Sequence, residues 1–155
     1  MTPAIKAAKK AKIDFTVREY EHDPAAESYG VEAAEKLGVA PVRVFKTLVA
    51  DCGGNRLAVA VVPVMQRLDL KLLAKAVGVK KAAMAEVKTV ERVTGYVVGG
   101  VSPLGQKKRL DTVIDASAED LETVFVSAGR RGLDIELSPQ DLARLTRGGF
   151  APVAR

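Results

Sequence analysis

The sequence is poor in the side chains from which most catalytic and metal sites are built. It has one cysteine, Cys52, which excludes an internal disulfide and any zinc or iron–sulfur site with several cysteine ligands. It has one histidine, His22, which excludes the usual histidine-rich metal sites and argues against a Ser-His-Asp triad. We therefore expect a site that works without a metal and without a cofactor.

Aromatic side chains and long apolar runs are also scarce. The chain has no tryptophan and only 5% aromatic residues, which argues against a surface on which successive bases stack. No apolar run approaches 18 residues, and the beginning of the chain does not resemble a signal peptide. We expect no membrane association and a cytoplasmic location.

Positive charge, by contrast, is abundant and unevenly distributed. The formal net charge is +5, and residues 69–110 hold nine basic and three acidic side chains, or +6. The remainder holds fifteen basic and sixteen acidic side chains, or −1. A concentration of this kind favours a phosphate-bearing ligand, and the alternative is a solvated helix face that carries lysines.

The residue pattern predicts a single α+β domain over 1–155, because helical and strand periodicities are mixed along a chain of one-domain length. We expect helices at 3–11, 31–38, 70–78, 85–95 and 138–146. We expect strands at 15–22, 43–50, 57–64, 109–117, 122–129 and 133–138, with a hairpin turn at 51–56 and a strand end running into a loop at 96–108.

The predicted strand RVFKTLVA (43–50) has a lysine in an otherwise apolar run. Alternation places Lys46 beside Val44 and Leu48 on one face and Thr47 on the other, and neither face is polar. A buried ammonium is costly unless it is paired or used. Lys46 is therefore either a lysine that guards a sheet edge against aggregation or a functional group at the mouth of a cavity.

Two glycine-containing stretches are further candidates. GGVSPLG (99–105) offers Gly99 and Gly100 beside Ser102, where a backbone without Cβ atoms allows close approach to an anion, although a tight structural turn is the simpler interpretation. It matches neither a Walker loop nor a dinucleotide-binding motif.

SAGRRGLDIEL (127–137) offers Ser127 and Asp134, with Glu136 on the same face as Asp134. No histidine lies near Ser127 in the sequence, so these groups suit the positioning of a substrate amine or hydroxyl better than nucleophilic attack. Solvent-exposed carboxylates are the alternative. We expect His22 to order a turn and Cys52 to lie exposed in one, and we assign neither a catalytic role.

Five stretches together resemble the YbaK-type Cys-tRNA(Pro) deacylases, which are relatives of the editing domain of bacterial prolyl-tRNA synthetase. They are YEHDP (20–24), VFKTLV (44–49), LAVAVVPV (57–64), GYVVGGVSPLGQKKRL (95–110) and SAGRRGLDIEL (127–137). Asp111 departs from the proline expected after RL, outside these motifs. The resemblance implies one α+β domain on a mixed, barrel-like sheet flanked by helices.

The resemblance also implies a trans-editing activity that removes cysteine mischarged onto tRNA(Pro), with the substrate's own thiol attacking its ester to leave as a cyclic thiolactone. Lys46 matches the essential lysine of the family, and the other implied pocket residues are Tyr20, Ser127, Asp134, Gly99 and Gly100. We add Tyr29, Thr47 and Ser102 as candidate substrate-binding residues.

The implied partners are the cysteine-bearing acceptor end of tRNA(Pro) and prolyl-tRNA synthetase. Two alternatives stay open: a deacylase for Ala-tRNA(Pro), and a non-catalytic module that binds tRNA or a synthetase.

Overall fold

The structure is a computed structural model that describes residues 1–26 and 28–155. Its elements, in chain order, are α1 (Pro3–Ala11), β1 (Phe15–Glu19), α2 (Tyr29–Leu37), the 3₁₀ helix η1 (Pro41–Arg43), β2 (Phe45–Asp51), β3 (Leu57–Pro63), α3 (Leu70–Val77), β4 (Ala83–Met84), α4 (Val87–Thr94), β5 (Asp111–Asp115), η2 (Ala116–Ala118), β6 (Val124–Arg130), β7 (Leu133–Leu137), α5 (Pro139–Thr146) and β8 (Gly149–Ala151).

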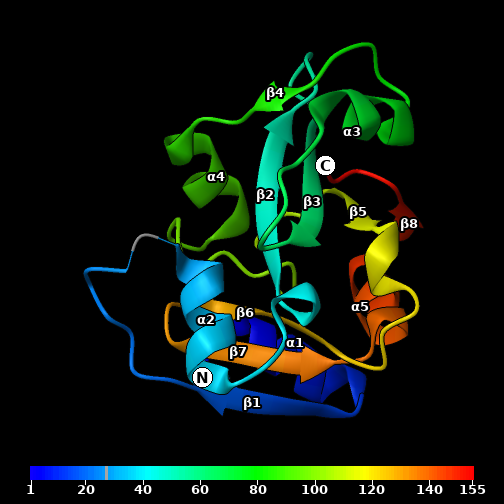
Figure 1. The fold of residues 1–155 in the computed structure, drawn as a ribbon. Coiled ribbons are helices and arrows are strands. Elements are labelled where there is room, and N and C mark those ends of the chain that lie inside the picture. Colours follow the sequence, from blue (N-terminus) through cyan, green and yellow to red (C-terminus); the bar gives the residue numbers. More distant parts are fainter. Residues whose placement is uncertain (27) are drawn as a thin grey trace.

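The strands form two sheets. The larger has the order β4-β2-β3-β5-β8 and is mixed, because β3–β5 and β5–β8 are parallel whereas β2 is antiparallel to both of its neighbours. The smaller is antiparallel, with the order β1-β7-β6, and Figure 1 shows it lying across the molecule below the upright strands β2 and β3. The α+β prediction and the mixed sheet are confirmed.

The sheets meet where β2 begins. A single parallel bridge joins Val44 to Phe125 on β6, and the described strands do not close into a barrel. In Figure 1, α2 and α4 stand on one side of β2, and α3 and α5 lie on the other. The start of β2, the β6–β7 hairpin and the two helices α2 and α4 therefore converge on one region.

Both faces of the β2–β3 hairpin are buried, which explains why the sequence of β2 does not alternate cleanly. Phe45 and Val49 pack into one apolar cluster, whereas Leu48 and Ala50 pack with a second. β3 lies between β2 and β5, and most of its side chains are fully buried. Near-continuous apolar runs are typical of strands covered on both faces.

Capping residues fix the helix ends much as the sequence predicts. The Asp69 carboxylate accepts from two amides at the start of α3, and the Ser138 hydroxyl accepts from Asp141 N at the start of α5. Gly38 and Gly78 end α2 and α3 in the left-handed conformation.

The predicted strand end at 96–108 is wrong, because the structure has turns there. Tyr96 is buried, and its hydroxyl donates to Leu104 O at 2.6 Å, so the segment closes on itself instead of pairing with a strand. The predicted strand at 15–22 ends at Glu19. The short strands β4 and β8 were not predicted, since two or three residues carry no periodicity.

Among the residues that the structure describes, no helix has the length and apolar character needed to cross a membrane.

Candidate active site

The region where β2, α2, α4 and the β6–β7 hairpin converge contains a cavity of about 460 Å³. Seven of the nine predicted site residues line it, although they are spread over more than a hundred positions of sequence. They are Tyr20, Tyr29, Lys46, Thr47, Gly99, Ser127 and Asp134. Gly100 and Ser102 are not among the lining residues.

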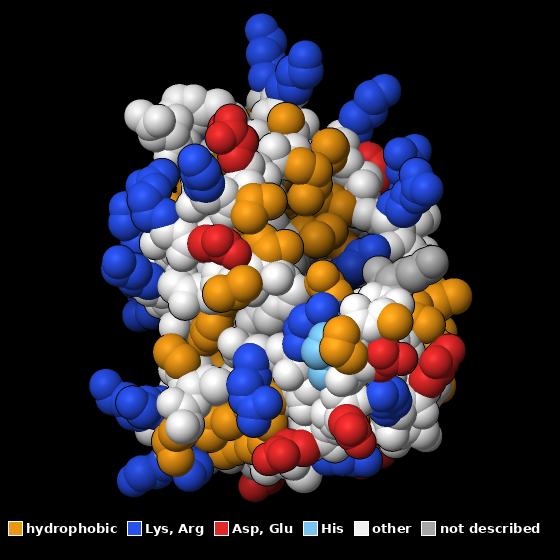
Figure 2. All heavy atoms as spheres, turned by 90° about the vertical axis from the view of Figure 1, so that its left-hand side faces the viewer, with side chains coloured by type: hydrophobic (Ala, Val, Ile, Leu, Met, Phe, Trp, Pro, Cys, Tyr) orange, Lys and Arg blue, Asp and Glu red, His pale blue; other side chains and the backbone are white. Residues whose placement is uncertain are grey.

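The mouth of the cavity is apolar. Tyr29, Met84, Val87 and Val98 line it and also rank among the exposed large apolar side chains of the protein. Figure 2 shows apolar side chains gathered across this face, with lysines and arginines around them. A ligand with an apolar or aromatic part and a nearby negative charge matches this distribution.

Lys46 extends from β2 into the cavity. On one side its backbone lies opposite Val62, whereas on the other side β4 pairs with β2 only at Ala50 and Asp51. Its side chain is half-buried and has no carboxylate within 4.0 Å among the described residues. Burial lowers the pKa of Lys46, and the positive charge of Arg67 lowers it further. Lys46 thus occupies an edge section of the sheet and lines the cavity at the same time.

Asp134 is the buried acid of the cavity. It lies on β7 opposite Ser127, is 6% exposed, and its side chain has no hydrogen bond or ion pair with any described residue. Burial raises its pKa from 3.8 to about 7. A carboxyl group in this state is ready to bind a cation or a hydrogen-bond donor brought by a ligand.

Three hydroxyl side chains line the cavity together with Lys46 and Asp134. Ser127 Oγ accepts from Gly129 N at 3.1 Å, which steadies the irregular end of β6 and leaves the hydroxyl proton free to donate. Thr47 Oγ1 is buried without a partner among the described residues. Burial raises the pKa of Tyr20, and the charge of Asp134 raises it further.

Gly99 and Gly100 both have structural roles. Gly99, with φ of +101°, lets the Tyr29 ring come so close that a Cβ would lie 2.8 Å from its Cε2 atom. Gly100 packs against the backbone of Arg130, and its N–H donates to Val97 O at 2.9 Å, so this amide is already used within the protein. The Ser102 hydroxyl is fully buried and accepts from Leu104 N at 3.2 Å.

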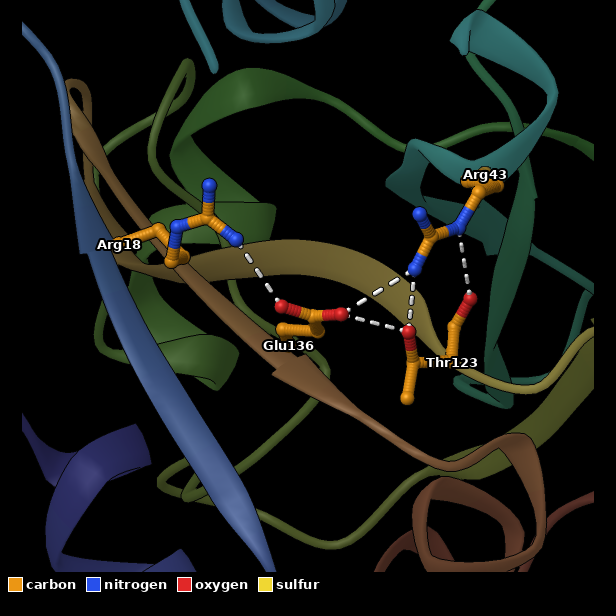
Figure 3. Close-up of polar contacts among 4 residues, drawn as sticks. All are labelled: Arg18, Arg43, Thr123 and Glu136. Carbon is orange, nitrogen blue, oxygen red and sulfur yellow. Dashed lines mark hydrogen bonds and ion pairs between the residues drawn. The ribbon is translucent and has the colours of Figure 1, made fainter. Parts of the chain in front are cut away.

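Glu136 lies two residues from Asp134 on β7, but its surroundings are different. Figure 3 shows its carboxylate between Arg18 and Arg43, with Thr123 alongside. The distances are 3.1 Å to each guanidinium and 2.6 Å to the Thr123 hydroxyl. Burial alone would raise the pKa of Glu136, but the hydrogen bonds from Thr123 and Arg18 and the two positive charges hold it below the ordinary value.

His22 and Cys52 lie outside the cavity lining. His22 Nδ1 is 2.9 Å from Glu32 Oε1, and the other oxygen of Glu32 accepts from Asp23 N, so the histidine orders a turn as predicted. Cys52 is half-buried in the β2–β3 turn, where we expected an exposed side chain, because its backbone pairs with Arg56 and draws it toward the hairpin. The described residues contain no group of three or more metal-ligating His, Cys, Asp or Glu side chains.

Among the lining residues that the sequence analysis missed, two are charged, namely Arg130 and Arg131 at the β6–β7 turn. They belong to the same RRGLD stretch that supplied Asp134. A pair of arginines three and four residues before a candidate acid is a usable pattern, but turn arginines are often solvated, so the pattern alone does not predict a site.

Comparisons with known proteins identify the family of the chain. The model of the aminoacyl-tRNA editing domain matches residues 23–145. The chain belongs to this family. Its members are aminoacyl-tRNA deacylases that edit mischarged tRNA. Five of the six residues that the resemblance implied line the cavity, and Gly100 does not.

Two relatives and one solved structure resemble the chain over most of its length. EbsC of Enterococcus faecalis, named as a proposed Cys-tRNA(Pro)/Cys-tRNA(Cys) deacylase, is 41% identical over 153 residues, covering 98% of this chain and 92% of that protein. The prolyl-tRNA editing protein ProX of Acetoanaerobium sticklandii is 27% identical over 142 residues, covering 88% and 84%. A crystal structure of a proposed trans-editing enzyme for prolyl-tRNA synthetase matches with a TM-score of 0.86 and 25% identity, over 99% of this chain and 95% of that one.

Proposed function

We propose that this family member removes cysteine from mischarged tRNA(Pro) and that the thiol of the substrate takes part in the cleavage. The observation that carries the proposal is the pair Lys46 and Asp134. Both groups line one cavity, and neither forms an ion pair with a described residue. The ammonium group of an aminoacyl ester supplies a partner for Asp134, and the oxyanion that develops on its carbonyl supplies a partner for Lys46.

In this proposal Asp134 binds the α-ammonium of the aminoacyl ester, and Ser127 donates to or accepts from the same end of the substrate. An arriving cation favours the ionised carboxylate, which burial otherwise disfavours. The amino acid is thereby oriented with its side chain toward the ester carbonyl, and orientation of this kind accounts for much of the rate in an intramolecular reaction.

The cysteine thiol then attacks the ester carbonyl carbon. A sulfur–carbon bond forms, the bond from carbon to the ribose oxygen breaks, and the thiol proton ends on that ribose oxygen. The products are tRNA with a free 3′ end and a cyclic thiolactone, which water opens to cysteine. The Lys46 ammonium stabilises the negative charge that develops on the carbonyl oxygen.

Substrate comparison tests the proposal directly. Under single-turnover conditions, purified protein should release the amino acid from Cys-tRNA(Pro) much faster than from Ser- or Ala-tRNA(Pro), and a thiolactone should appear only with cysteine. Faster release from Ala-tRNA(Pro) would support the alternative specificity, because alanine has no thiol and water must attack. Tight tRNA binding with no release from any substrate would support a non-catalytic module.

The site assignment has a test of its own. Lys46→Ala should slow release by about a hundredfold or more, the usual effect of removing one group that stabilises an oxyanion. Lys10→Ala, an exposed lysine on α1 outside the cavity, is the matched control and should release at the wild-type rate. Release by Lys46→Ala at the wild-type rate would contradict the role.

We also propose prolyl-tRNA synthetase as the source of tRNA selectivity. The name of the EbsC relative couples two different tRNAs, which supports recognition of the amino acid rather than of the tRNA body. Without the synthetase, Cys-tRNA(Pro) and Cys-tRNA(Cys) should be cleaved at similar rates. Adding the synthetase should favour Cys-tRNA(Pro), and an unchanged ratio would contradict the partnership.

A further inference from the structure

Arg131, at the β6–β7 turn, is held in an unusual way. Its Cζ atom lies 3.5 Å from the centre of the Tyr29 ring, so the guanidinium is stacked on tyrosine inside the lining of the cavity. Cation–π stacking fixes the plane of an arginine side chain and leaves its edges for hydrogen bonds.

One edge of this guanidinium has no partner in the part of the chain that the structure describes. Arg131 Nε and Nη2 are buried, and neither nitrogen forms a hydrogen bond with any described residue. These two nitrogens share one edge of the planar group, and their N–H bonds point the same way as a fork that matches two oxygens of a phosphate or carboxylate. Buried donors of a charged group are costly without an acceptor, so the arrangement indicates an acceptor that the described residues do not provide.

The charges of the cavity limit what that acceptor is. Lys46, Arg130 and Arg131 line the cavity as cations, and Asp134 lines it as an acid that burial keeps partly protonated. If Asp134 binds the α-ammonium and Lys46 faces the ester carbonyl, two cations are left over, and of these Arg131 is the one with buried donors that have no partner among the described residues. An aminoacyl-tRNA end carries one more kind of anion, the phosphodiester that joins its last two nucleotides.

We propose that the Nε and Nη2 edge of Arg131 binds this terminal phosphodiester, which leaves Lys46 free for the carbonyl oxygen. The inference rests on the proposed function, and it assigns the phosphate to a residue other than Lys46. Arginine suits this role because its fork fixes two oxygens at once, whereas lysine acts as a point charge.

The site is closed in the structure, because both nitrogens are shielded from solvent and the Tyr29 ring lies over the group. Tyr29 as a residue is 41% exposed, so the stack adjoins solvent and a phosphate can approach it from there. A phosphate that binds Arg131 therefore has to displace the Tyr29 ring in part.

The deciding experiment compares a substrate that contains the phosphodiester with one that does not. Wild type and Arg131→Gln are assayed on Cys-tRNA(Pro) and on 3′-cysteinyl adenosine, which has the ester and the ribose but no phosphate. We expect kcat/KM of the variant to fall about ten- to hundredfold on the tRNA, the usual effect of losing a charge-assisted pair of hydrogen bonds, and by less than twofold on the adenosine ester. Arg144→Gln, an exposed arginine on α5 outside the cavity, removes the same charge and should change neither rate by more than twofold.

Equal losses on both substrates would overturn the inference, because they would mean that Arg131 only holds Tyr29 and the cavity wall. No loss on either substrate would overturn it as well. If wild type cleaves neither substrate, the proposed function fails, and binding of nucleotides then tests the phosphate site without catalysis.

For that second measurement, adenosine 5′-monophosphate carries the phosphate at the position of the terminal phosphodiester, and adenosine lacks it. Wild type should bind the monophosphate about tenfold more tightly than adenosine, and Arg131→Gln should bind the two alike. Equal binding by wild type would overturn the inference whatever the deacylation assays show. Free cysteine serves as a third ligand, because weaker cysteine binding by the variant would assign the fork to a product carboxylate and would also overturn the phosphate assignment.

Discussion

Asp134 and Glu136 occupy the same face of the same strand, two residues apart, and the protein treats them in opposite ways. Glu136 receives hydrogen bonds or ion pairs from Arg18, Arg43 and Thr123, and its pKa is lowered. Asp134 has no side-chain partner among the described residues, and burial raises its pKa to about 7.

The difference shows that β7 carries both a structural carboxylate, Glu136, and a candidate functional one, Asp134. The Glu136 cluster ties β1, β7 and the residue before β6 to the 3₁₀ helix that precedes β2. Both arginines also lie over the buried ring of Phe125 on β6. That cluster fixes the position of β2 relative to the small sheet. Asp134, held in place by the same strand, is left for a ligand to complete.

Asp134→Asn should give the largest effect on stability, and the effect should be a gain. A raised pKa in the folded state means that stability is greatest below about pH 4 and falls until about pH 7, where the group is ionised without a partner. Three pKa units correspond to about 4 kcal/mol, so a neutral isostere should raise the free energy of unfolding at pH 8 by about 2–4 kcal/mol.

Urea unfolding at pH 8, 5 and 4 measures this gain, which should shrink at pH 5 and nearly vanish at pH 4. Asp120→Asn, an exposed residue, is the control and should stay within about 0.5 kcal/mol at each pH. A stability loss at pH 8 for Asp134→Asn would mean that the ionised carboxylate has a partner, and the contrast with Glu136 would be lost.

Glu136→Gln should have the opposite sign. Losing the charge leaves two partly buried guanidinium groups with a weaker acceptor, so we expect the free energy of unfolding at pH 7 to fall by about 1–2 kcal/mol. Because the folded-state pKa is lowered, the loss should be complete above the ordinary glutamate pKa and should shrink as pH falls through the folded value.

Urea unfolding measures this loss beside Glu119→Gln, an exposed control that should be near neutral. The deacylation rate per folded molecule of Glu136→Gln should remain at the wild-type value, since Glu136 does not line the cavity. A selective loss of rate with unchanged stability would reverse the roles assigned to the two carboxylates.

The pH dependence of activity should report Asp134. The ratio of kcat/KM between wild type and Asp134→Asn cancels the ionisation of the substrate thiol. It should rise about tenfold per pH unit below about 7, as the carboxylate forms, and should level above that value. A ratio that does not change between pH 5.5 and 8 would separate Asp134 from substrate binding.

Two hydroxyl variants should give the smallest effects. Ser127→Ala removes the acceptor of the Gly129 amide and should cost about 0.5–1.5 kcal/mol of stability, with a two- to fivefold loss of rate. Thr47→Val should be neutral or slightly stabilising, because its buried hydroxyl has no partner among the described residues. Thermal melts and single-turnover assays distinguish the two, and a marked destabilisation by Thr47→Val would reveal a partner for that hydroxyl.

Much of the fold and part of the site could be predicted from the sequence. Capping residues and apolar periodicity are local, and they gave the helices and the longer strands within a few residues. Lys46 is a candidate from the sequence because a charge interrupts an apolar strand. The motifs shared with the deacylase family add Tyr20, Ser127 and Asp134.

The rest depended on tertiary contacts. The sequence pattern could not show that the Gly100 amide is used by Val97, that Ser102 turns inward, or that Arg131 stacks on Tyr29 from a hundred residues away. It also could not separate Asp134 from Glu136, since the difference lies in arginines supplied by other elements.

Residues 153–155 influence the electrostatic environment of the cavity through Arg67. Asp115 accepts from the amides of Val153 and Ala154, and Arg155 exchanges two backbone hydrogen bonds with Arg67, whose charge acts on Lys46. The Arg67–Arg155 backbone pair thus holds a second cation near Lys46, and a change that disturbs this pair should weaken the lowering of the Lys46 pKa by Arg67.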